Sequence, residues 1–322
     1  MTKIKIDQQF ILVKFPIIFP ITYAVLLYSF PSFETGLILL TILLLAETHF
    51  GATWPFFLDR VNHSFITKNR IPLITIPIII IILSLVGFFF INKLFLLIFF
   101  AANMFHVTRQ SFGITKLYCK DIIENKFQEV SIYLINFIFF VVGFFRFYLP
   151  MISQNNLFYL NIIVLFLFLL TSIYYFIKFG FSENYFTFLT GCLVFYPMCF
   201  VSNPVHAIIM GVTMHYTQYL YLTYNICNLR KNNLSETNNL SEKNELTIYK
   251  KALNYILTII IYASLMTIFS FLGKSDEIFF KQLIIIPIIG QMLHFYLDSQ
   301  LWKFSDKHNR DNTLSYITKI IN

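Results

Sequence analysis

Long runs of apolar residues, each about the length needed to cross a bilayer, recur along almost the whole chain. A hydrocarbon core of about 30 Å needs roughly 20 apolar residues in one helix. Ten segments meet this requirement, at residues 9–30, 35–58, 73–91, 92–117, 130–150, 157–178, 182–200, 203–227, 250–272 and 277–303. The pattern predicts an all-α, polytopic integral membrane protein of about ten transmembrane helices, with residues 1–322 forming a single membrane domain.

The composition agrees with a chain embedded in lipid. Of the 322 residues, 57% are hydrophobic and 12% are charged, a balance that excludes an ordinary soluble protein. The formal net charge of +8 could indicate a nucleic-acid partner, but the basic residues are spread over short segments between the apolar runs. We therefore expect membrane lipid around the chain and no nucleic acid.

Basic residues also predict the orientation of the chain, because cytoplasmic loops carry an excess of Lys and Arg. With ten spans, one set of alternate loops holds Lys93, Lys274 and Lys281, with Arg146 near a helix end. The other set is far richer, with Lys3, Lys5, Arg60, Lys68, Arg70, Lys116, Lys120, Lys126, Lys178, Arg230, Lys231, Lys243, Lys250, Lys251, Lys303, Lys307, Arg310 and Lys319. This bias places both termini in the cytoplasm.

Two polar stretches lie outside the predicted spans. Residues 228–251 contain the sequence NNLSE twice, and this low complexity predicts a flexible cytoplasmic loop between the eighth and ninth helices. Residues 304–322 are expected to form a cytoplasmic tail. The four cysteines include no CxxC pair, so we expect unpaired thiols at Cys119, Cys192, Cys199 and Cys227.

Four histidines inside the predicted spans fall at similar depth. His49, His106, His215 and His294 lie on the second, fourth, eighth and tenth spans, which all run from outside to inside. They lie about 14, 14, 12 and 17 residues from the outer ends, which places them in one slab under about 10 Å thick. Ionisable groups in a membrane are costly and mark function, and neutral imidazole is a common metal ligand. The pattern predicts a metal site.

Polar residues near these histidines are candidates for supporting roles. Glu47, Gln218 and Asp298 are expected to orient imidazole N–H groups. Arg109 and Gln218 each lie three residues after a candidate ligand and so share its helical face.

Further polar side chains are candidates to act on a substrate. Tyr219, Arg109 and Gln110 are the candidate catalytic residues, and Asn103 and Gln291 could line the same pocket.

Other functions compete with a metal-dependent enzyme. A bis-histidine haem protein would carry electrons across the membrane, and a transporter would use the same polar groups to bind substrate or relay protons. A single histidine can also serve only in packing, by a hydrogen bond to a neighbouring helix. The chain has no P-loop, no HExxH and none of the tightly spaced histidine boxes of membrane fatty-acid desaturases.

The histidine segments resemble those of a known enzyme family. THFGATW, FHVTRQSFG, MHYTQY and LHFYLD are similar, in order and spacing, to the PHGxxD, HFGxxD, HxxxH and PHxxxxD motifs of the Brp/Blh-type membrane β-carotene 15,15′-dioxygenases. The resemblance implies that His49, His106 and His215 bind Fe²⁺, that His294 and Asp298 form the last motif, and that an apolar, carotenoid- or lipid-like substrate enters from the bilayer. We expect the protein to lie in a bacterial inner (plasma) membrane.

The chain departs from this family at several positions. Tyr219 stands where the family has the second histidine of HxxxH, and the aspartates that follow the first two motifs are missing. Either His294 or His206 then completes the site, or Tyr219 alters it and the reaction is not carotenoid cleavage. The expected function is a membrane-embedded non-haem iron oxygenase acting on an apolar substrate.

Overall fold

Helices make up most of the part of the chain that the structure describes. The computed structural model describes residue 8 and residues 10–118, 126–149, 154–237 and 245–321, and every regular element in these ranges is a helix. The predicted all-α class is confirmed.

Seven helices in the described ranges are long and apolar enough to cross a membrane, which is the make-up of an integral membrane protein. They are Phe10–Ser29, Pro31–Phe57, Ile71–Phe90, Lys126–Tyr148, Asn155–Phe179, Leu253–Leu272 and Ile278–Leu301.

The chain divides into two compact units, each built from two stretches of sequence. The first unit comprises Met1–Ile38 and Met104–Gln218, and the second comprises Leu39–Asn103 and Tyr219–Asn322. Three helices contain a boundary between the units, namely α2 (Glu34–Thr41), α6 (Asn92–Tyr118) and α10 (Pro204–Thr237).

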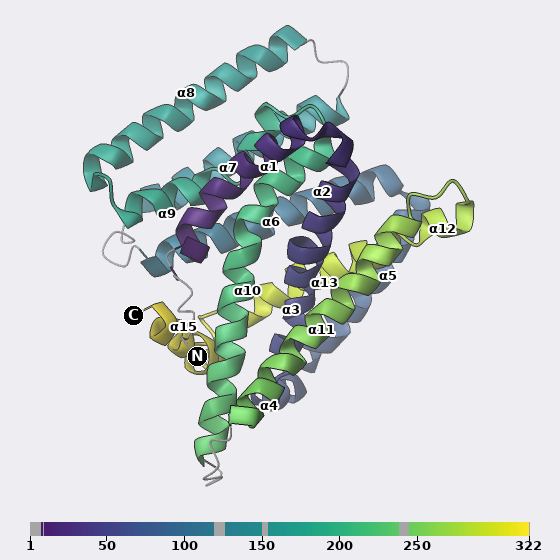
Figure 1. Cartoon of the computed structure of the whole chain (residues 1–322), viewed down its shortest axis with the longest axis vertical. Helices are drawn as coiled ribbons and strands as arrows, with labels where there is room; N and C mark the ends of the chain where they lie inside the picture. The colour runs from purple at the N-terminus through teal and green to yellow at the C-terminus, as the bar shows by residue number, and fades with distance from the viewer. Residues whose placement is uncertain (1–7, 9, 119–125, 150–153, 238–244, 322) are drawn as a thin grey trace. The chain divides into compact units, whose positions relative to one another are not determined.

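The first unit is organised around α7, which contacts α8, α9 and η5 (Figure 1). Besides its parts of α2, α6 and α10, it contains η1 (Phe10–Lys14), α1 (Phe15–Ser29), η2 (Pro31–Phe33), α7 (Lys126–Tyr148), α8 (Gln154–Phe179), α9 (Glu183–Cys192) and η5 (Tyr196–Cys199).

The second unit is organised around α3, which packs against α11 and α13, while α13 also packs against α5 (Figure 1). Besides its parts of α2, α6 and α10, it contains η3 (Ile42–Ala46), α3 (Glu47–Phe57), α4 (Arg60–Lys68), η4 (Ile71–Thr75), α5 (Ile76–Phe90), α11 (Glu245–Leu272), α12 (Ile278–Gln282), α13 (Ile285–Leu301), α14 (Lys307–Asn309), η6 (Arg310–Leu314) and α15 (Ser315–Ile321).

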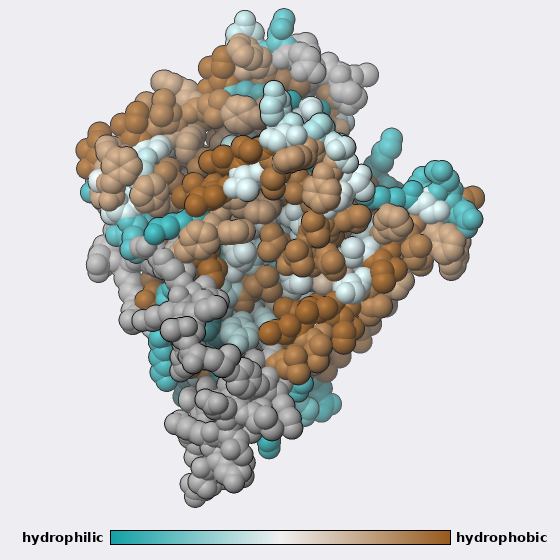
Figure 2. Space-filling view, in the orientation of Figure 1, coloured by the Kyte–Doolittle hydropathy of each residue, from teal (hydrophilic) through white to brown (hydrophobic). Residues whose placement is uncertain are grey.

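Helix α11 shows how these helices meet lipid. Leu253, Leu257, Ile260 and Ile261 are about half exposed and recur every three or four residues, so they form one outward stripe. Figure 2 shows a brown, apolar surface over α11. An apolar stripe of this kind is stable in contact with acyl chains rather than water.

Two predicted spans, 92–117 and 203–227, correspond to α6 and α10 but are not among the seven apolar helices. Both helices are long enough to cross, and both carry buried polar side chains, including Thr108 and Ser111 on α6 and Thr213 and Thr223 on α10. These polar residues make α6 and α10 less apolar than the seven helices. Polar side chains are tolerated in a membrane helix when they face protein rather than lipid.

The predicted helix at 182–200 is not continuous, so that expectation is wrong. Helix α9 ends at Cys192, and the chain then turns through η5, in which Pro197 occupies an early position. Ten residues of α9 span about 15 Å, roughly half of a bilayer core. Proline is compatible with the start of a helix but kinks or breaks its interior, which favours a break here.

The backbone around this break is bonded by polar side chains of the first unit. Asn136 on α7 donates to the Gly191 carbonyl at 2.7 Å, and Arg146 Nη1 donates to the Cys199 carbonyl at 2.6 Å. Asn161 on α8 donates to the same Cys199 oxygen at 3.0 Å. Irregular backbone is tolerated at membrane depth when protein groups satisfy it in this way.

The remaining boundaries differ in how far they match the sequence prediction. The chain bends at Ile91 between α5 and α6, as expected for two separate spans. Helices α10 and α11 continue into the predicted loop 228–251 from both sides, and residues 238–244 lie outside the described ranges. The predicted tail is largely helical and packed, with Asn309, Thr313 and Ile317 buried.

Three of the four cysteines lie in the described ranges. Cys192, Cys199 and Cys227 are buried and none of them is in a disulfide bond, as predicted, and Cys119 lies outside those ranges.

Candidate metal centre

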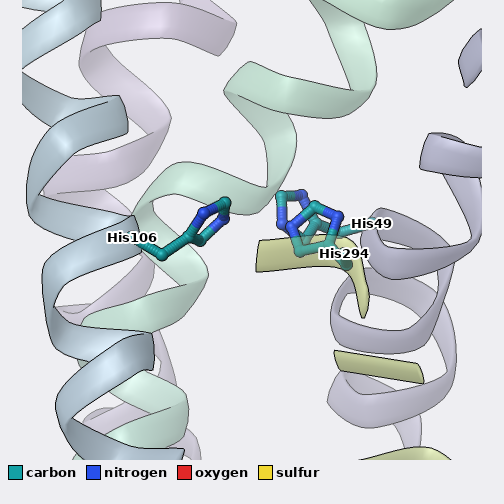
Figure 3. A group of neighbouring side chains, drawn as sticks. All are labelled: His49, His106 and His294. Carbon is teal, nitrogen blue, oxygen red and sulfur yellow. The ribbon is translucent and has the colours of Figure 1, made fainter. Parts of the chain in front are cut away.

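The predicted metal ligands are buried histidines on different helices. His49, His106 and His294 are each buried, and each offers a ring nitrogen with which it could hold a metal ion (Figure 3). His49 comes from α3 and His294 from α13, both in the second unit, whereas His106 comes from the part of α6 in the first unit. His215, the fourth predicted ligand, lies on α10 in the first unit and is also buried.

His49 and His294 form a close pair, called here the α3/α13 pair. Their ring centroids are 4.5 Å apart and their planes meet at 70°, so one ring points its edge at the other (Figure 3). Their exposed fractions are 0% and 1%. Phe50 packs edge-on against His294 at 5.1 Å, so the pair lies in an apolar, aromatic setting.

The separation of the two rings fits two ligands of one ion. A metal bonds imidazole nitrogen at about 2.0–2.1 Å, which puts the ring centre about 3.2 Å from the metal. Two such rings about 90° apart have centres about 4.5 Å apart, and two on opposite sides have centres about 6.4 Å apart. The observed 4.5 Å between His49 and His294 matches the first arrangement.

A chain of buried hydrogen bonds holds His294. Its Nδ1 lies 2.5 Å from the Thr53 hydroxyl, and that hydroxyl lies 3.0 Å from the Tyr219 hydroxyl. Tyr219 donates to Asp298 Oδ1 at 2.6 Å. Thr53, Tyr219 and Asp298 are at most 3% exposed, so water does not compete for these bonds.

The directions of these bonds follow from counting protons. With Asp298 ionised, its oxygens only accept, and Tyr219 uses its one proton on Asp298. Thr53 must then donate to the Tyr219 oxygen, and His294 must donate its Nδ1–H to Thr53. A neutral His294 therefore carries its lone pair on Nε2, the state that a metal ligand requires.

His106 and His215 form a second pair, called here the α6/α10 pair. Their ring centroids are 6.2 Å apart and their planes meet at 75°. His215 Nδ1 donates to the carbonyl oxygen of Val212 on its own helix. Since a carbonyl only accepts, this bond leaves the lone pair of a neutral His215 on Nε2.

The predicted supporting residues have different partners. Glu47 is 2% exposed and accepts a long bond of 3.5 Å from Gln291 Nε2, which joins α3 to α13. Gln218 donates to the Leu12 carbonyl at 2.6 Å, so this amide N–H ties α10 to η1. Asp298 acts on His294 through the hydrogen-bond chain, because its Oδ2 lies 3.9 Å from His294 Nε2.

The three candidate catalytic residues fall into two groups. Tyr219 packs against both rings of the α3/α13 pair, with centroid distances of 4.5 Å to His49 and 5.3 Å to His294. Arg109 and Gln110 lie on α6 in the first unit and are partly buried.

Two features of the site were not predicted from the sequence. Thr53 joins His294 to Tyr219, and its position four residues after His49 on the same helical face was the available signal. His206, considered as an additional ligand, uses both ring nitrogens elsewhere: Nδ1 bonds Tyr23 and Nε2 bonds Glu34. In this arrangement, neither nitrogen of His206 is available to a metal.

Comparisons with protein-family models, with curated proteins and with solved structures find no match to this chain.

Proposed function

We propose that this chain is a membrane-embedded non-haem iron oxygenase that acts on an apolar, carotenoid- or lipid-like substrate. The observation that carries the proposal is the α3/α13 pair: two buried imidazoles with ring centres 4.5 Å apart, one of them held by a hydrogen-bond chain that ends on Asp298. Imidazole ligands are common to many divalent metals, and iron is the choice that the resemblance to the carotenoid dioxygenases favours.

In this proposal, His49 and His294 hold the ion, and the ligand role of His106 and His215 stays a prediction from their matched depth in the sequence. Ferrous iron, when bound, supplies the capacity to activate O₂. Asp298, Tyr219 and Thr53 keep the ligand nitrogen of His294 unprotonated and fix its ring, a type of support whose loss costs about 10–100-fold in metal affinity.

The surroundings of the pair support the choice of an apolar substrate. The spans Pro31–Phe57 and Ile278–Leu301 carry His49 and His294, so the pair lies at membrane depth. Phe50 and Phe295 are buried beside these histidines. A substrate dissolved in the bilayer can reach such a site without crossing water, and we place the protein in a bacterial inner (plasma) membrane.

A haem protein is the second candidate, and one distance favours it. Axial imidazoles bind haem iron from opposite faces, which requires ring centres about 6.4 Å apart. The α6/α10 pair, at 6.2 Å, is close to this separation, whereas the α3/α13 pair, at 4.5 Å, is too close.

Metal analysis with an optical spectrum separates these candidates. The full-length protein is purified anaerobically in detergent, and its iron content and absorption spectrum are measured. We expect about one iron per chain and no Soret band, followed by O₂-dependent cleavage of β-carotene or oxidation of another apolar polyene. A Soret band would favour haem, and a protein that binds no iron would favour a transporter.

Four alanine variants test the ligand assignment. His49→Ala, His106→Ala, His215→Ala and His294→Ala are each expected to lower the iron content, whereas His63→Ala, at an exposed position on α4, should leave it unchanged. If the four variants retain as much iron as His63→Ala, the ligand assignment is wrong.

A further inference from the structure

A second cluster of titratable side chains lies in the first unit and takes no part in the proposed metal centre. The Tyr23 hydroxyl on α1 lies 2.8 Å from His206 Nδ1 on α10. His206 Nε2 lies 2.7 Å from Glu34 Oε1, at the first residue of α2. One imidazole therefore links a phenol to a carboxylate.

The two ends of this cluster differ in their access to solvent. Tyr23 is 1% exposed and His206 is 3% exposed, whereas the Glu34 side chain is 47% exposed. Glu34 follows the short turn Pro31–Phe33, which opens the candidate span Pro31–Phe57 just after the span Phe10–Ser29. The carboxylate therefore lies at the end of a span, while Tyr23 lies about 10 Å deeper by helix rise.

The protonation pattern of the cluster follows from its acceptors. An ionised Glu34 only accepts, so His206 Nε2 carries a proton and donates it to Glu34. In the neutral imidazole, Nδ1 then has the lone pair and accepts the Tyr23 O–H. This order of carboxylate, imidazole and hydroxyl is the one that lets an imidazole take a proton from a hydroxyl group.

We propose that Tyr23, His206 and Glu34 form a proton relay that connects the buried phenol to water. In the outward direction, the Tyr23 O–H bond breaks as an Nδ1–H bond forms, and the Nε2–H bond breaks as Glu34 gains the proton. Glu34 then releases this proton to water, and Tyr23 is left as a phenolate. The reverse steps return a proton to Tyr23.

The rate at which Tyr23 gains and loses its proton tests this relay. Tyr23 is replaced in the full chain by 3,5-difluorotyrosine, whose phenol ionises near neutral pH, and phenolate absorbance is followed after a pH jump in detergent. A positioned acid–base group contributes about 10²–10⁴-fold to proton transfer. We therefore expect Glu34→Gln to slow the relaxation about 100-fold, because its amide can accept the Nε2–H bond but cannot take the proton.

Two controls separate a relay from a structural hydrogen bond. Glu34→Asp keeps a carboxylate and should restore much of the rate that Glu34→Gln loses. The same analogue at Tyr255, a buried tyrosine whose hydroxyl bonds Thr223 at 2.8 Å, should relax slowly and be insensitive to Glu34→Gln.

The relay is refuted if position 23 relaxes as slowly as position 255, or if Glu34→Gln leaves its rate unchanged. Because the probe needs no metal, this result is independent of the proposed oxygenase function.

Discussion

The Thr53 hydroxyl links a candidate metal ligand, His294, to the side chains of Tyr219 and Asp298. It accepts a hydrogen bond from His294 Nδ1–H and donates one to the Tyr219 oxygen, and Tyr219 in turn donates to Asp298. Without this hydroxyl, His294 Nδ1 would lose its acceptor in a buried environment. The ligand nitrogen of His294 thus depends on a residue that is not itself a metal ligand.

We predict that Thr53→Val weakens metal binding by about 10–100-fold, the usual cost of losing support for a metal ligand. Thr48→Val is a matched control, because Thr48 is buried on the same helix and its hydroxyl bonds the Leu44 carbonyl of the preceding element, η3. Titration with a competing chelator measures both affinities. Equal affinities in the two variants would contradict the role of Thr53.

His308 should make stability depend on pH. Burial and the charge of Arg230 lower the pKa of His308 below 6.5, and its ring stacks on Phe65 and bonds Asn62. The unfolded chain therefore binds more protons just below pH 6.5, so stability falls as the pH drops through this range.

We predict that the melting temperature of the protein falls between about pH 7.5 and pH 5, and that His308→Gln makes this fall smaller. His63→Gln, at an exposed position, should leave the pH profile unchanged. If both variants keep the profile of the original protein, His308 does not contribute to the pH dependence.

Among the helices, the C-terminal elements show how one buried charge organises a segment. Arg230 on α10 is 1% exposed and lies 3.5 Å from Asp59. Its guanidinium also donates to the Asn312 carbonyl at 2.8 Å and to the Thr313 hydroxyl at 2.9 Å, both in η6. The segment expected to be a tail is therefore attached to α10 and to the start of α4.

We predict that Arg230→Met destabilises the second unit by about 3–5 kcal/mol, because it leaves the partly desolvated Asp59 without its cation. Arg310→Met should cost less than about 0.5 kcal/mol, since Arg310 is exposed and bonds nearby backbone carbonyls. Chemical denaturation in detergent and limited proteolysis of the C-terminal segment measure the difference. Equal stability of the two variants would show that Arg230 does not hold this segment.

At the scale of the whole molecule, the number of crossings decides the side on which each terminus lies. Seven helices qualify by length and apolar composition, and α6 and α10 are also long enough to cross. The broken segment from α9 to η5, whose carbonyls are bonded by Asn136, Arg146 and Asn161, would supply a tenth crossing. Ten crossings place both termini on one side.

We predict that the N-terminus and the C-terminus both face the cytoplasm, in agreement with the distribution of basic residues. Fusions of a fluorescent protein and of alkaline phosphatase to the C-terminus, together with protease protection of an N-terminal tag, test this directly. Termini on opposite membrane faces would mean an odd number of crossings and would contradict a topology of ten crossings.

The sequence by itself determined the helical class, the membrane character, the boundary near Ile91 and the burial of the four histidines. These properties are local, since a bilayer requires long apolar helices and a charged or polar residue within them must face protein. The sequence around His294 also indicated that Asp298 supports this histidine, because the two residues are one helical turn apart.

The tertiary structure decided which polar groups meet. Thr53 on α3 and Tyr219 on α10 are distant in sequence, so no helical spacing could reveal the bond that supports His294. Likewise, Tyr23, Glu34 and His206 come together only because α1, the start of α2 and the start of α10 pack in one unit. Helical periodicity specifies the face of each residue, whereas the partner on that face depends on how the helices pack.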